Sequence, residues 1–181
     1  MSLLIETERL IIRELEKSDS KDFIDMESDG TLSIIFDEWE TCAEWMDDWI
    51  AEAKKLYLVN NPYKEYLAYA IAEKETGKVI GAVGCSAYED LNEIGITYFI
   101  GSKYRNVGYA AEATKAFTQY FLEDYKDINH IIATVHPDNI PSCRTVEKAG
   151  YNLMKRIMYK DIYDDESKEY KLYLYEKKCI Y

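Results

Sequence analysis

The chain has 181 residues, 48% of them hydrophobic, and its 22 basic and 34 acidic side chains give a net charge of −12. This length and apolar content predict one folded domain over residues 1–181 and exclude a disordered chain. The acidic balance argues against a nucleic-acid partner, and a membrane span is not expected because no apolar run reaches about 18 residues. The first residues lack the basic and long apolar segments of a signal peptide, so we expect a cytoplasmic protein.

The expected elements follow from apolar periodicity and from the residues that start and stop helices. In chain order they are a strand in Leu3–Leu15, a short helix from Ser18 or Asp19 to Ser28, a longer helix from Thr41 to Asn60, a hairpin of Tyr66–Glu73 and Lys78–Tyr88, a strand at Asn92–Ile100, a helix at Ala110–Leu122, a strand at Asn129–His136, a short helix at Pro141–Gly150, and a hairpin of Tyr151–Ile162 and Tyr170–Cys179. Thr31–Glu40 is ambiguous between a strand and a packed loop. This order predicts a mixed α/β (α+β) domain, in which helices flank one mostly antiparallel sheet with a parallel junction in its middle.

The segment Arg105–Ala110 joins the central expected strand to the helix after it. The first amides of a helix have no partner within the helix, and they lie at the positive end of its dipole. A phosphate satisfies both, so we predict a phosphate-bearing ligand at this turn. The alternative is an ordinary turn in which Gly108 only relieves crowding. The sequence offers neither Gly-Lys-Ser/Thr nor Gly-x-Gly-x-x-Gly, which argues against nucleotide-triphosphate and dinucleotide loops.

The positions of the cysteines and tyrosines bear on redox state and on subunit contacts. The four cysteines are widely spaced and include no Cys-x-x-Cys pair: Cys42, Cys85, Cys143 and Cys179. This pattern favours reduced, mostly buried thiols over a zinc site or a disulfide framework. Several of the 17 tyrosines fall in the last hairpin, namely Tyr170, Tyr173 and Tyr175. They are compatible with a homodimer contact and equally with packing of the sheet.

Four places in the chain, together with the order of elements, resemble the GNAT superfamily of N-acetyltransferases. They are Glu8–Arg13, Gly77–Gly81, Arg105–Ala113, and Asn139–Ser142 with Glu147–Tyr151. The closer resemblance is to the RimJ/RimL-like branch, whose members acetylate the N-termini of ribosomal proteins. The four places span nearly the whole chain in the family's order, so the resemblance implies one GNAT-like domain.

The resemblance implies acetyl-coenzyme A as the acetyl donor. In the family, backbone amides of the matching loop hold the pyrophosphate, at the anion site derived above from the helix start. The end of the preceding strand pairs with the pantetheine arm, and an amide there polarises the thioester carbonyl. The implied cofactor-binding residues are Phe99, Ile100, Gly101, Arg105, Asn106, Val107, Gly108, Tyr109, Ala110, Asn139, Ser142 and Arg144. Without the family, helix capping explains Asn139 and Ser142, and a solvated surface explains Arg144.

The catalytic residues are less directly implied. Many relatives place a tyrosine seven residues after the matching asparagine, to protonate the departing thiolate, but Val146 stands there. The RimJ/RimL-like branch commonly has serine three residues after the asparagine, which implies Ser142 as the general acid or as a donor to the sulfur. Glu93 is the candidate base, two residues before the family's usual carboxylate position, here Gly95, and on the same strand face. Glu93 as an exposed structural carboxylate is the alternative, with His136 as another base.

The implied activity is acetyl transfer to a primary amine by direct attack in a ternary complex, with no metal. A protein or peptide N-terminal α-amine is favoured over lysine because it is more often neutral near pH 7. We expect a cationic acceptor to enter between two groups of residues, the aromatic side chains Phe36, Trp39 and Trp45 and the acidic side chains Asp164, Asp165 and Glu166. Two alternatives stay open: a catalytically silent acyl-CoA-binding or sensing module, and an acetyltransferase of a small amine such as an antibiotic or polyamine.

Overall fold

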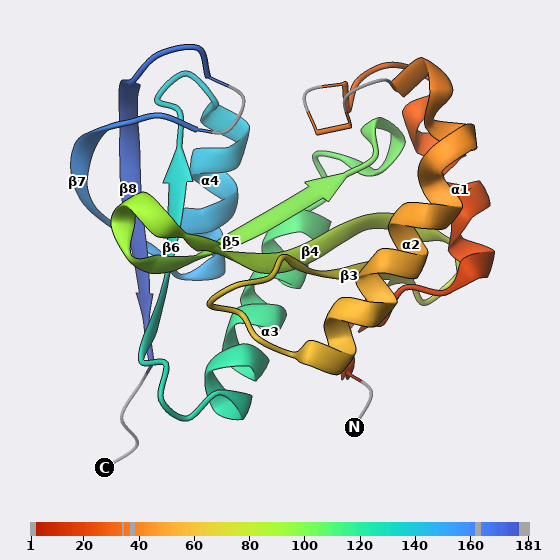
Figure 1. Cartoon of the computed structure of the whole chain (residues 1–181), viewed down its shortest axis with the longest axis horizontal. Helices are drawn as coiled ribbons and strands as arrows, with labels where there is room; N and C mark the ends of the chain where they lie inside the picture. The colour runs from red at the N-terminus through yellow and green to blue at the C-terminus, as the bar shows by residue number, and fades with distance from the viewer. Residues whose placement is uncertain (1–2, 34, 37–38, 162–163, 178–181) are drawn as a thin grey trace.

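The structure is a computed structural model, and it describes residues 3–33, 35–36, 39–161 and 164–177, with only the backbone of Trp39. Over these residues, one eight-stranded sheet carries four α-helices (Figure 1). The elements in chain order are β1 (Leu4–Glu6), β2 (Leu10–Arg13), α1 (Ser20–Glu27), α2 (Cys42–Val59), β3 (Leu67–Glu73), β4 (Val79–Tyr88), β5 (Glu93–Ile100), α3 (Tyr109–Asp124), β6 (His130–Val135), α4 (Ile140–Ala149), β7 (Asn152–Tyr159) and β8 (Lys168–Glu176). Within the described ranges, none of the helices has the length and apolar content to cross a membrane.

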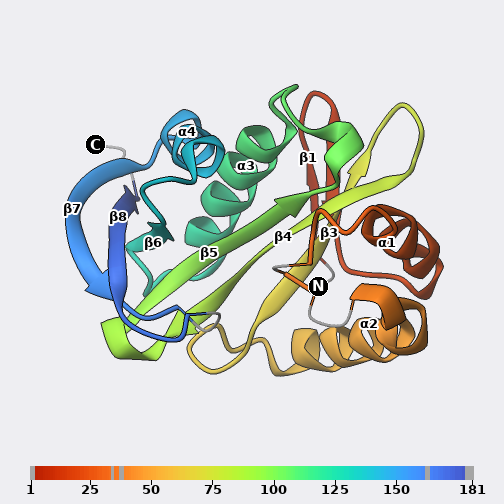
Figure 2. The same ribbon diagram turned by 90° about the horizontal axis from the view of Figure 1, so that it is seen from above.

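The strands lie in the order β1-β2-β3-β4-β5-β6-β8-β7, and every neighbouring pair is antiparallel except β5 with β6. This confirms the mostly antiparallel sheet with one parallel junction. Helices α1 and α2 cover one face of the sheet, and α3 and α4 cover the other (Figure 2). Because strand residues alternate between faces, β5 sends Phe99 to the α1–α2 core and Ile94 and Ile96 to the α3–α4 core.

The parallel junction is the place where the sheet opens. Strands β5 and β6 are in register at one residue pair, Gly95 with Ile132. Beyond that pair the two arrows diverge in Figure 1. The strands are parallel, so the turn after β5 and the N-terminus of α4 both lie at the open end. The facing backbone groups of the two strands are therefore left for water or a ligand.

The N-terminal apolar segment forms two strands where the sequence predicts one. The amide of Thr7 donates to the carbonyl oxygen of Leu10 at 2.9 Å and closes a turn between β1 and β2. The alternating pattern therefore belongs to β2 alone. The ambiguous segment Thr31–Glu40 consists of turns and the start of a 3-10 helix over its described residues, and Ile34 lies outside them.

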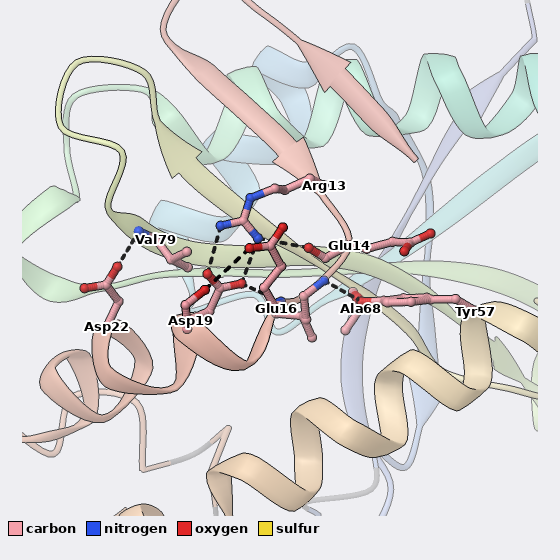
Figure 3. A network of polar contacts seen from close by, with 10 residues as sticks. Arg13, Glu14, Glu16, Asp19, Asp22, Tyr57, Ala68 and Val79 are labelled. Atoms are coloured by element: carbon pink, nitrogen blue, oxygen red, sulfur yellow. Dashed lines mark hydrogen bonds and ion pairs between the residues drawn. The ribbon is translucent and has the colours of Figure 1, made fainter. Parts of the chain in front are cut away.

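A mostly buried ion pair fixes the point where the chain leaves β2 for α1 (Figure 3). Arg13 donates two hydrogen bonds of 2.8 Å to the two carboxylate oxygens of Asp19, whose side chain is buried. Asp19 also accepts the amide of Glu16. The phenol oxygen of Tyr57, on α2, accepts the amide of Leu15 and donates to a carbonyl of β3. These contacts hold both N-terminal helices against the end of the sheet.

The last hairpin forms as expected, but β8 inserts between β6 and β7. Its three tyrosines are 8%, 0% and 7% exposed, which shows that they pack within this chain: Tyr170, Tyr173 and Tyr175. A homodimer therefore gains no support from them. The cysteines that the structure describes are free and buried, as the sequence predicts: Cys42, Cys85 and Cys143. Cys179 lies outside the described residues.

Candidate active site

The turn between β5 and α3 presents unpaired backbone amides. Asn106 (φ +67°) and Gly108 (φ +93°) adopt the left-handed backbone conformation, which glycine reaches without a Cβ penalty. Gly108 is the N-cap of α3 and provides no side-chain cap. Over the described chain, the amides of residues 106–111 have no acceptor, and pairing starts with Glu112 donating to Gly108 at 3.1 Å. Free amides at the positive end of a helix form a donor set for an anion.

The side chain of Arg105 turns back toward the protein. Its Nε donates to the carbonyl oxygen of Ile100 at 2.8 Å, and its Nη2 donates to that of Thr31 at 3.4 Å. Arg105 thus ties the turn to the end of β5 and to the segment between α1 and α2. The backbone amides that follow it remain as the donors that an anion can reach.

The side chains at the end of β5 are used for packing. The ring of Phe99 meets that of Phe36 at a centroid distance of 5.2 Å, and Ile100 lies in the opposite core. Gly101 donates its amide to a carbonyl of β4, and a Cβ added to it would lie 2.7 Å from Met26. A side chain at this position would therefore displace the side chain of Met26 on α1. Only the backbone of this strand end can therefore serve a ligand.

Asn139, Ser142 and Arg144 gather at the N-terminus of α4. Asn139 is the N-cap, and its Oδ1 accepts the amide of Ser142 at 3.1 Å. The hydroxyl oxygen of Ser142 lies 2.7 Å from the phenol oxygen of Tyr98 on β5. Arg144 is exposed on the helix surface. Ser142 therefore connects the helix to the strand across the open junction.

Glu93 begins β5, at the closed end of the junction. Its Oε2 lies 2.6 Å from Nε2 of His130, the first residue of β6, and the two side chains are 35% and 38% exposed. The sequence did not predict this partner. At the neighbouring position, a Cβ added to Gly95 would lie 2.5 Å from the ring of Tyr88. Tyr88 thus occupies the space beside the strand position where the resemblance places a carboxylate in relatives.

The aromatic residues expected around the acceptor are partly committed to the core. Phe36 is buried, and its ring lies 5.6 Å from that of Trp45. The side chain of Trp39 lies outside the described residues. His136, the alternative base, accepts the amide of Asp138 on Nδ1 at 3.3 Å, which gives it a role in the local turn.

The acidic group of the last hairpin divides into two kinds of residue. Asp164 accepts hydrogen bonds from Lys168 at 2.7 Å and from the phenol of Tyr170 at 2.8 Å. These bonds, that of Lys168 first, lower the pKa of Asp164. Asp165 and Glu166 are exposed. Asp164 therefore stabilises its own hairpin, and the other two residues carry the charge that an acceptor can meet.

A clamp that the sequence did not predict holds the turn against the N-terminal hairpin. Arg9 donates from Nε to Glu112 at 2.7 Å and from Nη1 to the carbonyl oxygen of Val107 at 3.0 Å. Glu112 also accepts the hydroxyl of Thr7 at 2.6 Å. The guanidinium carbon of Arg9 lies 4.5 Å from the ring centroid of Tyr109. Arg9 and Glu112 both fall within segments that carry the family resemblance, but no local pattern pairs residues 103 apart.

Glu27, at the end of α1, is a second unpredicted feature near the turn. It is 0% exposed, and neither carboxylate oxygen has a hydrogen-bond partner among the residues that the structure describes. Burial, and then the nearby Asp29, raise the pKa of Glu27 to about 7, while Arg105 opposes the rise. This carboxyl group therefore changes protonation near neutral pH, close to the side chain that fixes the turn.

Known proteins resemble this chain in sequence and in fold. The family model described as an acetyltransferase (GNAT) domain matches residues 9–152. The uncharacterised N-acetyltransferase YnaD of Bacillus subtilis is 27% identical over 146 residues, which is 81% of each chain. A RimL ribosomal alpha-N-protein acetyltransferase, solved with coenzyme A, has a TM-score of 0.77 at 14% identity and covers 96% of this chain and 98% of its own. The microcin self-immunity acetyltransferase MccE, solved with acetyl-CoA and AMP, has a TM-score of 0.74 at 14% identity over 94% of each chain.

Proposed function

Since this chain belongs to the GNAT acetyltransferase family and is therefore an acyltransferase, we propose that it moves an acetyl group from acetyl-CoA to a primary amine, with a protein or peptide N-terminal α-amine as the favoured acceptor. One observation carries the donor: unpaired amides at residues 106–111 lie beside strands that separate after a single residue pair. RimL and MccE, which share the fold, were solved with coenzyme A and acetyl-CoA.

The residues at the open junction fit such a donor. The pyrophosphate would accept hydrogen bonds from the amides of Asn106–Ala110, since the amide of Arg105 is paired with the carbonyl oxygen of Ser102. The pantetheine arm would lie along β5 at Phe99–Gly101. Asn139, Ser142 and Arg144 would contact it from the α4 side. When bound, the donor supplies an activated acetyl thioester. Because the last side chains of β5 are buried in the two cores, the strand would contact it through backbone groups, as one strand contacts another.

The proposed reaction is a direct attack in a ternary complex. The amine nitrogen bonds to the thioester carbon, the carbon–sulfur bond breaks with its electron pair on sulfur, and the amine loses a proton. Ser142 donates to the sulfur, and a backbone amide of β5 polarises the carbonyl oxygen. Glu93, paired with His130, is the proposed base, and His136 or water is the alternative. These groups complete the transfer without a metal.

We infer the acceptor from the acidic charge of this chain and from the basicity of the candidate amines. An α-amine with a pKa near 7.8 is roughly one-quarter neutral at about pH 7.4, whereas a lysine near 10.4 is only about 0.1% neutral. A weak base therefore suits an N-terminal amine, and RimL is named for such an acceptor. A small amine such as an antibiotic or polyamine is the alternative, and MccE is named for microcin immunity. Buried free thiols suit a reducing compartment and support a cytoplasmic location.

The test is thiol release from acetyl-CoA, followed over a panel of peptides with free N-termini, small amines and polyamines. We expect turnover with at least one peptide N-terminus and none with the same peptide N-terminally blocked. Ser142→Ala should lower turnover while coenzyme A binding, measured by calorimetry, persists. Turnover on polyamines alone would replace the peptide acceptor with a small amine.

A second candidate is a catalytically silent acyl-CoA sensor. It is favoured by Val146 at the usual position of the acid and by His130, which engages Glu93. Tight binding of acetyl-CoA with no turnover on any member of the panel would establish this candidate and refute the enzyme.

A further inference from the structure

The open junction is bridged on its α3–α4 face by a tyrosine from β5. The phenol oxygen of Tyr98 lies 2.7 Å from Oγ of Ser142 and 3.3 Å from the carbonyl oxygen of the same residue. Ser142 and Val146 are four residues apart on α4, so they lie on one helix face. Position 146 lacks the tyrosine that many relatives have there. The phenol of Tyr98 reaches the same face of α4 from β5, one helical turn from Val146.

We propose that Tyr98 is a positioning residue that directs the hydroxyl group of Ser142 toward the thioester sulfur, an inference that rests on the proposed function. A serine hydroxyl has one hydrogen to donate. When the phenol donates to Oγ, that single hydrogen stays available for the sulfur. At 2.7 Å either oxygen can be the donor, and the proposal assigns the phenol hydrogen to Oγ in place of the 3.3 Å contact to the carbonyl oxygen of Ser142.

The state of the phenol suits a donor. Burial, as the largest cause, raises the pKa of Tyr98 to about 12, so the hydroxyl stays protonated at neutral pH. The groups of α4 that face it are the hydroxyls of Ser142 and Thr145 and the thiol of Cys143. None of them carries a positive charge that would favour a tyrosinate.

The pair acts on the charge that develops on sulfur. As the carbon–sulfur bond breaks, its electron pair moves to sulfur, and the hydrogen bond from Ser142 stabilises the forming thiolate. Donation from Tyr98 polarises the hydroxyl of Ser142 and strengthens that bond. Both residues keep their protons, and the thiolate takes its proton from water after it leaves.

The test compares Tyr98→Phe with Ser142→Ala and with the double variant. Tyr69→Phe is the control, because Tyr69 belongs to the core cluster against which Tyr98 packs but lies on β3. Three quantities are measured: kcat, KM for acetyl-CoA, and the pKa of the thiol of bound coenzyme A. The thiol is titrated by thiolate absorbance, as a difference from protein with desulfo-coenzyme A, which cancels the signals of the protein's own cysteines and tyrosines.

We expect Tyr98→Phe to lower kcat about tenfold, to leave KM within about twofold, and to raise the pKa of the bound thiol by about 1. Ser142→Ala should do the same, and the double variant should lose no more than Ser142→Ala alone. Tyr69→Phe should change none of these values. Losses that multiply in the double variant, or an unchanged thiol pKa in Tyr98→Phe, would overturn the proposal.

Two further arms keep the result decisive. If Tyr98→Phe does not fold, 3-fluorotyrosine at position 98, a stronger donor of similar shape, should lower the pKa of the bound thiol, and no change would overturn the role of Tyr98. If the unmodified protein turns over no amine, the proposed function fails by itself. The thiol titration still decides whether Tyr98 acts on sulfur through Ser142.

Discussion

Glu27 combines full burial with two carboxylate oxygens that find no partner within the described ranges. The pKa of this group is about 7 in the folded chain and near 4.5 when unfolded. Between about pH 4.5 and pH 7, Glu27 keeps its proton in the folded state and has lost it in the unfolded state. The stability of the fold therefore decreases as pH rises through this window.

Glu27→Gln should remove this pH dependence. The amide cannot ionise, so the variant escapes the loss of stability that Glu27 causes as pH rises. From pH 5 to pH 8, the free energy of unfolding of Glu27→Gln should therefore rise by about 2 kcal/mol relative to that of the unmodified protein. Urea denaturation at the two pH values measures the difference. Glu123→Gln, at an exposed carboxyl group of α3, is the control and should leave the dependence intact. The same pH dependence of the unfolding free energy in Glu27→Gln and in the unmodified protein would contradict the raised pKa of Glu27.

Two of the ion pairs of the N-terminal region, Arg13–Asp19 and Lys17–Asp47, differ in burial, and we expect them to differ in energy. Asp19→Asn breaks a pair whose carboxylate side chain is 4% exposed, and it should cost about 3 kcal/mol because Arg13 keeps its charge without a partner. Asp47→Asn removes the exposed pair with Lys17, whose side chains are 52% and 84% exposed, and it should cost less than about 0.5 kcal/mol. Chemical denaturation of both variants measures the contrast. Equal losses would show that burial is not the deciding factor.

At the scale of elements, glycines with a left-handed backbone conformation occupy a helix end and a hairpin turn. Gly150 caps the C-terminus of α4 at φ +104°, and a Cβ there would lie 3.2 Å from the ring of Tyr175. Gly77, in the β3–β4 turn, has φ +70°, and no atom of the described residues lies within 4 Å of such a Cβ. A side chain at either position would strain the backbone, but only at Gly150 would it also meet a neighbouring ring.

Gly77→Ala should therefore cost about 1 kcal/mol from strain alone, and Gly150→Ala about 2–3 kcal/mol, since the buried ring of Tyr175 must also move. Thermal unfolding of the two variants compares these costs. A loss in Gly150→Ala no larger than in Gly77→Ala would show that the ring yields freely.

Most elements could be predicted from the sequence because their signals are local. The helix after Gly108 and the hairpin around Gly77 follow from apolar spacing and from turn residues. The break between β1 and β2 could not, because it depends on a hydrogen bond from Thr7 to Leu10 within an apolar run. The insertion of β8 between β6 and β7 is a matter of pairing, which periodicity does not specify.

At the scale of the whole molecule, the net charge of −12 becomes a test of the acceptor. The variant Asp165→Lys with Glu166→Lys should raise KM for a cationic acceptor several-fold at low salt, with a smaller effect at high salt because exposed charges are screened. Asp164 is left unchanged, since it stabilises the hairpin. The control reverses Glu123 and Asp124 on α3, far along the chain from this hairpin. An unaltered KM at both salt concentrations would refute a cationic acceptor.

The site was predictable where it depends on one segment and hidden where it depends on several. The unpaired amides proposed to bind the pyrophosphate follow from a strand, a glycine and a helix start within a few residues. The clamp of Arg9 on Glu112 and the contact of Tyr98 with Ser142 join segments 103 and 44 residues apart. The sequence identifies the chemistry of these side chains, but only the folded chain determines which ones meet.

The separation of β5 from β6 places two strand edges in the interior of a sheet. An edge with unpaired amides and carbonyls accepts any extended chain, including a segment of another molecule. An extended ligand that fills this gap and an invading peptide compete for the same groups. Coenzyme A added during concentration should therefore delay aggregation, and storage without it should favour intermolecular strand exchange at this seam.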